Sequence, residues 1–226
     1  MKLNSKRTIL VGLAFLSICA FWQMYDSIVP LILTKTFHMN ETFSGAIMAA
    51  DNILALFLLP FFGSVSDKSH TKIGKRMPFI LFGTGCAIIL MNILPLLDNS
   101  YAAQPSGFKT ASFVIVLGLL LVAMGTYRAP AVALMPDVTP KPLRSRANAI
   151  INLMGAVGGI LYLGVAAVLY PNSKTAGVEH VNYQPLFIVV SAIMFLAIAV
   201  LFLTIKEPKL TAENQALEKQ HPEWNL

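Results

Sequence analysis

The segment GSVSDKSHTKIGKRMPF, residues 63–79, is the most informative part of this chain, because it concentrates charge between two segments that carry none. The run LALFLLPFF (54–62) precedes it, and the run ILFGTGCAIILMNILPLL (80–97) follows it. Its charged and titratable side chains are Asp67, Lys68, His70, Lys72, Lys75 and Arg76. A polar segment between long apolar runs is typical of a loop that joins two membrane-spanning helices.

The composition of the whole chain indicates the same class of protein. Of its 226 residues, 56% are hydrophobic and only 12% are charged, whereas soluble domains carry about 25% charged residues. We therefore expect an integral membrane protein in a lipid bilayer. Its net charge of +6 then marks cytoplasmic loops rather than a nucleic-acid partner. Cys19 and Cys86 lie inside apolar runs, so neither a disulfide framework nor a metal site is expected.

Six apolar runs are long enough to cross a bilayer, which takes about 20 residues. They fall near 9–33, 42–62, 78–97, 111–135, 147–170 and 185–205. The first run continues past Trp22 to Leu33, which is longer than the roughly 7–15 apolar residues of a signal peptide, so we expect an uncleaved helix. The sequence thus predicts an all-α, integral membrane six-helix bundle over residues 1–205. A polar cytoplasmic tail, 206–226, follows and is expected to contain a short helix.

The lysines and arginines predict the orientation of the bundle. Thirteen of the 17 fall on one side, in the N-terminal segment, in the loops after the second and fourth runs, and in the tail. Lys2, Lys6 and Arg7 are those of the N-terminal segment. Lys35, Lys109 and Lys174 fall on the other side. This bias predicts that both termini are cytoplasmic, in a multi-pass protein of the cell membrane.

The charged loop has a specific spacing beyond its role as a topology signal. Gly63 is expected to end the second helix, Asp67 follows by four residues, and Gly74 precedes Lys75 and Arg76. Glycine adopts backbone conformations that other residues resist. An acid beside bases at a helix end can form charge-assisted hydrogen bonds that hold one conformation and break in another. We interpret these five residues as a conformational latch.

This loop resembles the G-x-x-x-D…G-[RK]-[RK] signature of the major facilitator superfamily, with one more residue between Asp and Gly than in the commonest version. In particular, LPFFGSVSDKSHTKIGKRMPFIL (59–81) is similar to the corresponding loop of sucrose transporters and of the related glycoside–pentoside–hexuronide cation symporters. A second block, AVALMPDVTPKPLRSRANAIINLMGAVGGIL (131–161), resembles the same branch. It places Asp137, Arg146 and Asn148 at the turn between the fourth and fifth helices.

The resemblance implies a fold of twelve helices, built from inverted three-helix repeats, of which this chain provides the N-terminal half. The tail then resembles the start of the linker between the two halves. The missing C-terminal half, or a second copy of the chain, would complete the transporter. The resemblance also implies that the first, second, fourth and fifth helices line a central cavity.

Three charged residues inside the apolar runs are functional candidates, because such charges are costly in a bilayer. Asp26 lies in the first run, Asp51 in the second and Arg128 in the fourth. A structural ion pair between helices is the simplest explanation. Alternatively, Asp26 or Asp51 carries a coupling proton and Arg128 binds substrate.

Other polar and aromatic residues near these charges are candidates for substrate binding. They are Tyr25, Trp22, Tyr127, Asn52 and Asn152. Interfacial anchoring or helix packing is the alternative role for each of them.

Two departures from the resemblance affect the expected chemistry. Arg128 lies four residues before Val132, where the sucrose branch has its arginine; the two positions share a helix face. The carboxylate pair of the melibiose-type relatives falls on Ala55 and Leu59. Proton coupling is therefore favoured over sodium coupling.

These observations predict a proton-coupled sugar or glycoside symporter that works by alternating access. A carrier of a non-sugar solute, or an inactive remnant without transport, are the alternatives. No arrangement of nucleophile and base and no phosphate-binding loop is apparent, and the four histidines are scattered in loops and tail. We therefore expect no enzyme activity, no cofactor and no metal.

Overall fold

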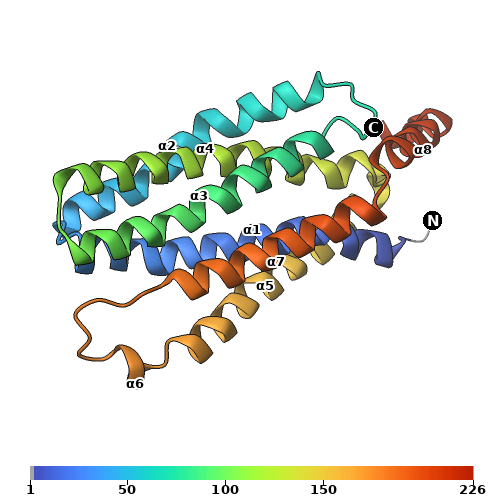
Figure 1. Ribbon diagram of the computed structural model, residues 1–226. Helices are drawn as coiled ribbons and strands as arrows, with labels where there is room; N and C mark the ends of the chain where they lie inside the picture. The colour runs from blue at the N-terminus through green and yellow to red at the C-terminus, as the bar shows by residue number, and fades with distance from the viewer. Residues whose placement is uncertain (1–2, 226) are drawn as a thin grey trace.

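The computed structural model describes residues 3–225, so Lys2 of the predicted N-terminal basic segment lies outside the described residues. The chain forms long helices joined by short loops (Figure 1). The elements are α1 (Ser5–Leu31), η1 (Ile32–Thr36), α2 (Glu41–Asp67), α3 (Met77–Ala103), α4 (Gly107–Asp137), η2 (Lys141–Leu143), α5 (Arg144–Leu169), α6 (Asn172–Thr175), α7 (Gln184–Thr204), α8 (Glu207–Gln220) and η3 (Pro222–Asn225).

Within residues 3–225, six helices are long and apolar enough to cross a membrane. They are α1 with η1, α2, α3, α4, α5 together with η2, and α7. Many of their large apolar side chains face outward, such as Phe57 on α2 and Leu203 on α7, which are 67% and 75% exposed. The predicted all-α, six-span membrane bundle is therefore confirmed.

Local sequence explains where the helices begin and end. The Asn4 side chain accepts a hydrogen bond from the Arg7 backbone N–H at 3.1 Å, which starts α1 at Ser5. Pro78 lies in the first turn of α3, where the missing N–H costs nothing. Gly63 does not end α2, which continues for one more turn to Asp67, because an isolated glycine weakens a helix without stopping it.

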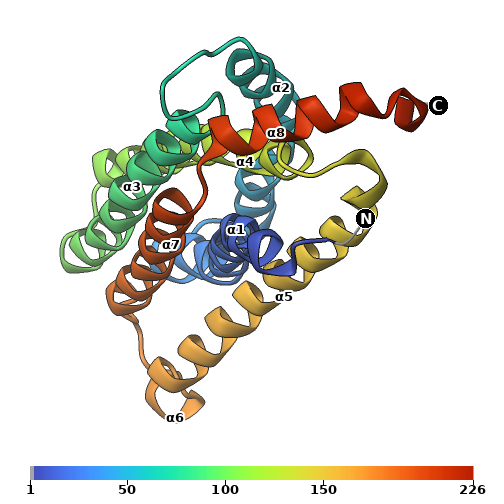
Figure 2. The ribbon, with the colours of Figure 1, turned by 90° about the vertical axis from the view of Figure 1, so that its right-hand side faces the viewer.

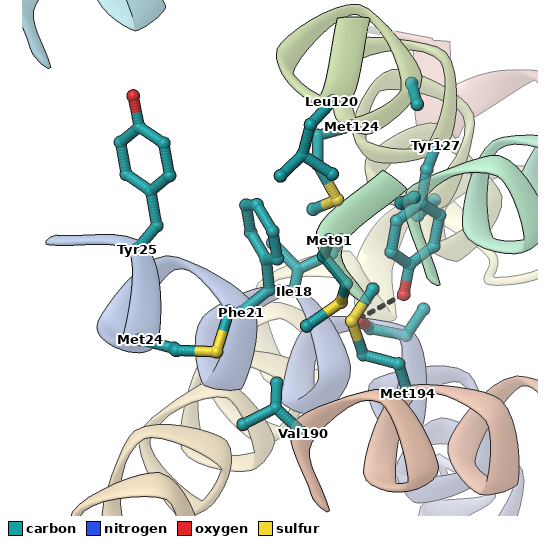
Figure 3. Packing of buried hydrophobic residues seen from close by; sticks show 14 of the residues in the cluster. Ile18, Phe21, Met24, Tyr25, Met91, Leu120, Met124, Tyr127, Val190 and Met194 are labelled. Atoms are coloured by element: carbon teal, nitrogen blue, oxygen red, sulfur yellow. Dashed lines mark hydrogen bonds between the residues drawn. The ribbon is translucent and has the colours of Figure 1, made fainter. Parts of the chain in front are cut away.

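Each long helix packs mainly against one or two others. In the structure α1 contacts α5 and α7, α3 contacts α4 and α7, and α2 packs mainly on α4. The core between them is apolar: Phe21 of α1, Met91 of α3, Met124 of α4 and Met194 of α7 meet there (Figure 3).

Contact between α1 and α5 is close because α5 carries glycines on that face. A Cβ atom at Gly158 would lie 2.0 Å from the Leu16 carbonyl oxygen of α1. One at Gly155 would lie 2.9 Å from Cys19 Sγ. Small residues let helix backbones approach in membranes, and here they bring α5 against α1 at Leu16 and Cys19.

Both ends of the chain lie at the same end of the bundle (Figures 1 and 2). We call this the terminal end, and the opposite end, where α6 lies, the distal end. The predicted short helix of the tail is α8, which crosses the terminal end (Figure 2).

Candidate functional site

A cavity of about 460 Å³ opens beside α1, and it contains the three charges of the spanning helices. Its lining comes from α1, α2, α4 and α5. The lining residues are Phe15, Ile18, Cys19, Trp22, Asp26, Asp51, Arg128, Val132 and Asn152. The structure thus brings two carboxylates, one guanidinium, one amide and one indole ring to a single cavity.

The charges in this cavity are not used to hold helices together. Within residues 3–225, no carboxylate lies within 4.0 Å of Arg128, and neither Asp26 nor Asp51 forms an ion pair. Arg128 instead lies over the Trp22 ring, 5.6 Å from its centre. The Asn52 side-chain N–H donates to Asp51 at 2.8 Å. The static ion pair that the sequence left open as an alternative is not formed.

The two tyrosines proposed from sequence do not line the cavity. Tyr127 is fully buried, and its hydroxyl donates to the Ala14 carbonyl at 2.9 Å and contacts Ser17. Tyr25 is 1% exposed and packs edge-on against Trp22 at 5.3 Å. Figure 3 shows the two tyrosine side chains directed apart, Tyr127 towards α1 and α7.

Helix geometry explains this placement. Consecutive residues on a helix do not face the same direction, so Tyr25 and Tyr127 turn away when Asp26 and Arg128 face the cavity. Asn52 follows the same rule: it is exposed and does not line the cavity. Asn152 and Trp22 do line it.

A second polar group lies at the terminal end, around the loop between α2 and α3. We call it the Arg76 cluster, and it consists of Ser66, Asp67, Lys75, Arg76 and Asp137. Arg76 is only 4% exposed. Its guanidinium donates to Asp137 at 2.9 Å, to the Gly63 carbonyl at 3.3 Å, and to Ser66 and Asp67. One side chain therefore links the end of α2, the start of α3 and the end of α4.

Lys75 adds a second cation to the cluster. Its Nζ lies 3.1 Å from Asp137 and 3.8 Å from Asp67. Preceding it, Gly74 has a φ of 121°, a conformation that side chains with a Cβ rarely adopt. The residues of the predicted latch are thus brought together, with Asp137 as the partner that joins them from α4.

Glu207, the first residue of α8, completes this cluster and was not predicted from sequence. It is 1% exposed. One carboxylate oxygen accepts from the backbone N–H groups of Lys75 and Arg76 at 2.9 and 2.8 Å, and the other from Met77 at 2.8 Å. These donors belong to the first residue of α3, its N-cap residue and the residue before it, at a helix start, where a carboxylate is favoured by unpaired N–H groups and by the helix dipole.

Two other side chains of α8 form hydrogen bonds to α4 and α5. Asn214, 4% exposed, donates to the Asp137 carbonyl at 3.1 Å and so covers the end of α4. Glu218 accepts from Arg144 of α5 at 2.8 Å. By contrast, Arg146 and Asn148 lie exposed on α5, and neither forms a hydrogen bond or ion pair within residues 3–225.

A third polar group lies at the distal end. Asp98 of α3 is completely buried, and neither carboxylate oxygen has a hydrogen-bond partner within residues 3–225. His180 Nε2 lies 4.0 Å from it but bonds Asn99 at 2.9 Å, and its Nδ1 bonds Thr36 at 3.3 Å. Burial, followed by the nearby negative charge of Asp98, raises the pKa of Tyr183.

Within the part of the chain that the structure describes, no three His, Cys, Asp or Glu residues are placed to hold a metal ion. The central cavity itself presents carboxylate, guanidinium, amide and indole groups. Two acids without ion-pair partners can bind protons, and a guanidinium beside an indole ring can bind a polar, ring-shaped solute.

Comparison with known proteins relates this chain to transporters. The family model of the Major Facilitator Superfamily matches residues 11–224. Sucrose transport protein SUC3 of Arabidopsis thaliana is 34% identical over 158 residues, which cover 65% of this chain and 26% of that protein. Sucrose transport protein SUT3 of Oryza sativa subsp. indica is 34% identical, with 62% and 30% covered.

A human protein is also similar in sequence, over a longer part of this chain. Solute carrier family 45 member 3 of Homo sapiens is 25% identical over 186 residues, which cover 80% of this chain and 34% of that protein. The chain thus spans between about a quarter and a third of the length of these relatives.

Proposed function

Since the chain belongs to the Major Facilitator Superfamily, we propose that it forms one six-helix half of a secondary transporter that moves a sugar or glycoside with protons by alternating access. The observation that carries the proposal is the composition of the central cavity: Asp26, Asp51 and Arg128 share it without forming ion pairs. Unpaired charges in a membrane bundle are costly and are functional by default.

The second half of the pathway is supplied by another six-helix bundle, either from a longer chain or from a second copy. Support comes from the exposure of polar groups around the cavity. Asp26 and Asn152 are exposed, and Asp51 is half-buried. Facing lipid, such groups are unfavourable, whereas facing a second bundle they would enclose a solute.

In this proposal each charge has a role. Arg128, held over Trp22, binds sugar hydroxyls with its planar set of donors. Asp26 or Asp51 carries the proton. The Arg76 cluster fixes one conformation of the bundle and breaks in the other, because its partners come from separate helices. The names of the sucrose transport proteins favour sucrose-like substrates.

The role of Arg128 is tested by Arg128→Ala in membrane vesicles from cells that express the complete transporter. We expect sucrose uptake to fall to background, because the binding donors are lost, while the amount of inserted protein stays unchanged. Lys174→Ala, which removes an exposed cation of α6, serves as the control and should transport normally. Wild-type uptake by Arg128→Ala would refute the proposed substrate site.

Proton coupling is tested separately with Asp26→Asn and Asp51→Asn. The acid that carries the proton is needed for accumulation driven by a pH gradient but not for exchange of sugar across the membrane. We therefore expect one of the two variants to lose gradient-driven uptake and to keep sucrose exchange. If both variants accumulate sucrose as wild type does, neither acid is the proton carrier.

A further inference from the structure

A second cavity, of about 450 Å³, lies at the terminal end where the first turn of α1 meets the junction of α7 and α8. Four basic side chains line it, two from α1 and two from the α7–α8 junction. They are Lys6, Arg7, Lys206 and Lys209. We call this cavity the terminal basic pocket. It is separate from the central cavity and shares no lining residue with it.

Charge in this pocket is not balanced by the protein. Glu213 is the one acid of its lining, and it pairs with Lys209 at 4.0 Å. Within residues 3–225, Lys6, Arg7 and Lys206 have no carboxylate within 4.0 Å. The start of α1 adds the positive end of a helix dipole. Like charges that converge on one cavity repel each other, so an anion between them would be favoured.

The position of the pocket indicates which kind of anion fits. Its walls include the apolar residues Leu10, Ile205 and Leu210. Beside it, Ile9 of α1 is 43% exposed and Leu203 of α7 is 75% exposed. The pocket thus lies at the level where apolar spans end and polar chain begins, which is the depth of phospholipid headgroups. Acyl chains could run from it along the exposed apolar faces of α1 and α7.

We propose that the terminal basic pocket binds the phosphate of an anionic phospholipid headgroup. Basic pockets between spans near the membrane surface have the charge and depth for such lipids. Lys206 directly precedes Glu207, which caps α3. An occupied pocket would therefore hold the start of α8 where Glu207 reaches the Arg76 cluster, and so would favour the latched conformation.

The test compares two double variants of the purified protein in detergent. Lys6→Gln/Lys206→Gln removes two charges of the pocket. Lys68→Gln/Lys72→Gln removes two exposed charges from the loop between α2 and α3, also at the terminal end. Both are titrated with phosphatidylglycerol and with phosphatidylcholine, and bound lipid is counted by native mass spectrometry.

We expect the wild type to prefer phosphatidylglycerol. The pocket variant should bind it on the order of tenfold to thirtyfold more weakly, since each basic residue near the surface contributes about 1 kcal/mol. The loop variant should bind within about twofold of wild type. Equal weakening in both variants, or no preference for phosphatidylglycerol in the wild type, would overturn the proposal.

A separate experiment tests whether the ligand of the pocket is a lipid or free phosphate. Inorganic phosphate is added at millimolar concentration, and thermal unfolding and bound phosphatidylglycerol are both measured. We expect phosphate to leave both unchanged, because it lacks the acyl chains that the apolar walls would hold. If phosphate alone stabilises the wild type as phosphatidylglycerol does and displaces the lipid, the lipid proposal is wrong and the ligand is the free anion.

Discussion

Each end of the bundle contains a buried carboxylate, and the two carboxylates differ in the hydrogen bonds that they accept. At the terminal end, Glu207 is 1% exposed and accepts three backbone hydrogen bonds. At the distal end, Asp98 is 0% exposed, and within residues 3–225 it accepts none. Burial is therefore not what distinguishes the ends. The ends differ in the donors that meet the carboxylate: three consecutive backbone N–H groups, of residues 75–77, point at Glu207, whereas the His180 ring approaches Asp98 only to 4.0 Å.

This difference indicates which end of the bundle is more stable. A buried acid that is fully hydrogen-bonded stabilises its surroundings, whereas one without donors carries a desolvation cost. The terminal end is thus expected to be the rigid one. Three substitutions test this comparison, each measured by thermal unfolding in detergent with a thiol-reactive dye that reports the exposure of Cys19 and Cys86.

The largest effect is expected for Glu207→Ala, which leaves the backbone N–H groups of residues 75–77 without their acceptor. We expect a loss of about 3–5 kcal/mol, which lowers the Tm by roughly 10 °C. Glu207→Gln keeps one acceptor oxygen and should lose less. Glu213→Ala, an exposed acid of the same helix, should change the Tm little. A Glu207→Ala variant as stable as Glu213→Ala would show that the cap does not stabilise the terminal end.

An intermediate effect is expected for Gly74→Ala. Besides its φ of 121°, a Cβ atom there would lie 2.2 Å from Glu207 Oε2, so we expect a loss of about 2–3 kcal/mol. Gly177 is a matched control near the distal end: its φ is 76° but nothing lies within 4 Å of an added Cβ. Gly177→Ala should cost only about 1 kcal/mol. Equal losses would mean that backbone strain alone, and not contact with Glu207, sets the cost.

The smallest effect, of opposite sign, is expected for Asp98→Asn. It removes a buried charge without removing a hydrogen bond, so stability should stay the same or rise by about 1 kcal/mol. Asp137→Asn, which weakens the bonds to Arg76 and Lys75, should instead destabilise the protein. A large loss in Asp98→Asn would show that the two ends are alike.

Sequence reasoning located the features of the fold that depend on local spacing. The six spans follow from runs of apolar residues, and the Arg76 cluster was predicted because Asp67, Gly74, Lys75 and Arg76 lie within one short loop. The resemblance placed Asp137 at the turn between the fourth and fifth helices, and its contact with Arg76 is a finding of the structure. Each of these signals lies in a single stretch of chain or in one recognisable motif.

Sequence reasoning failed where a contact joins residues far apart in the chain, or where it depends on the direction in which a side chain points. Glu207 is 130 residues away from Met77, and its local signal is an acid at the start of a polar tail helix. Tyr25 and Tyr127 were chosen because they adjoin Asp26 and Arg128, yet neighbours on a helix face different ways. Neither the pairing of distant segments nor side-chain direction can be obtained from spacing alone.

The contact between Glu207 and the start of α3 also has a consequence for biosynthesis. The backbone N–H groups of residues 75–77 leave the ribosome 130 to 132 residues before the carboxylate that accepts them. At roughly 5–20 residues per second, this interval is on the order of ten seconds. During that time the earlier spans are in the bilayer with the loop between α2 and α3 still uncapped. Glu207 of α8, which is made after all six spans, can therefore cap the start of α3 only long after that segment has been synthesised.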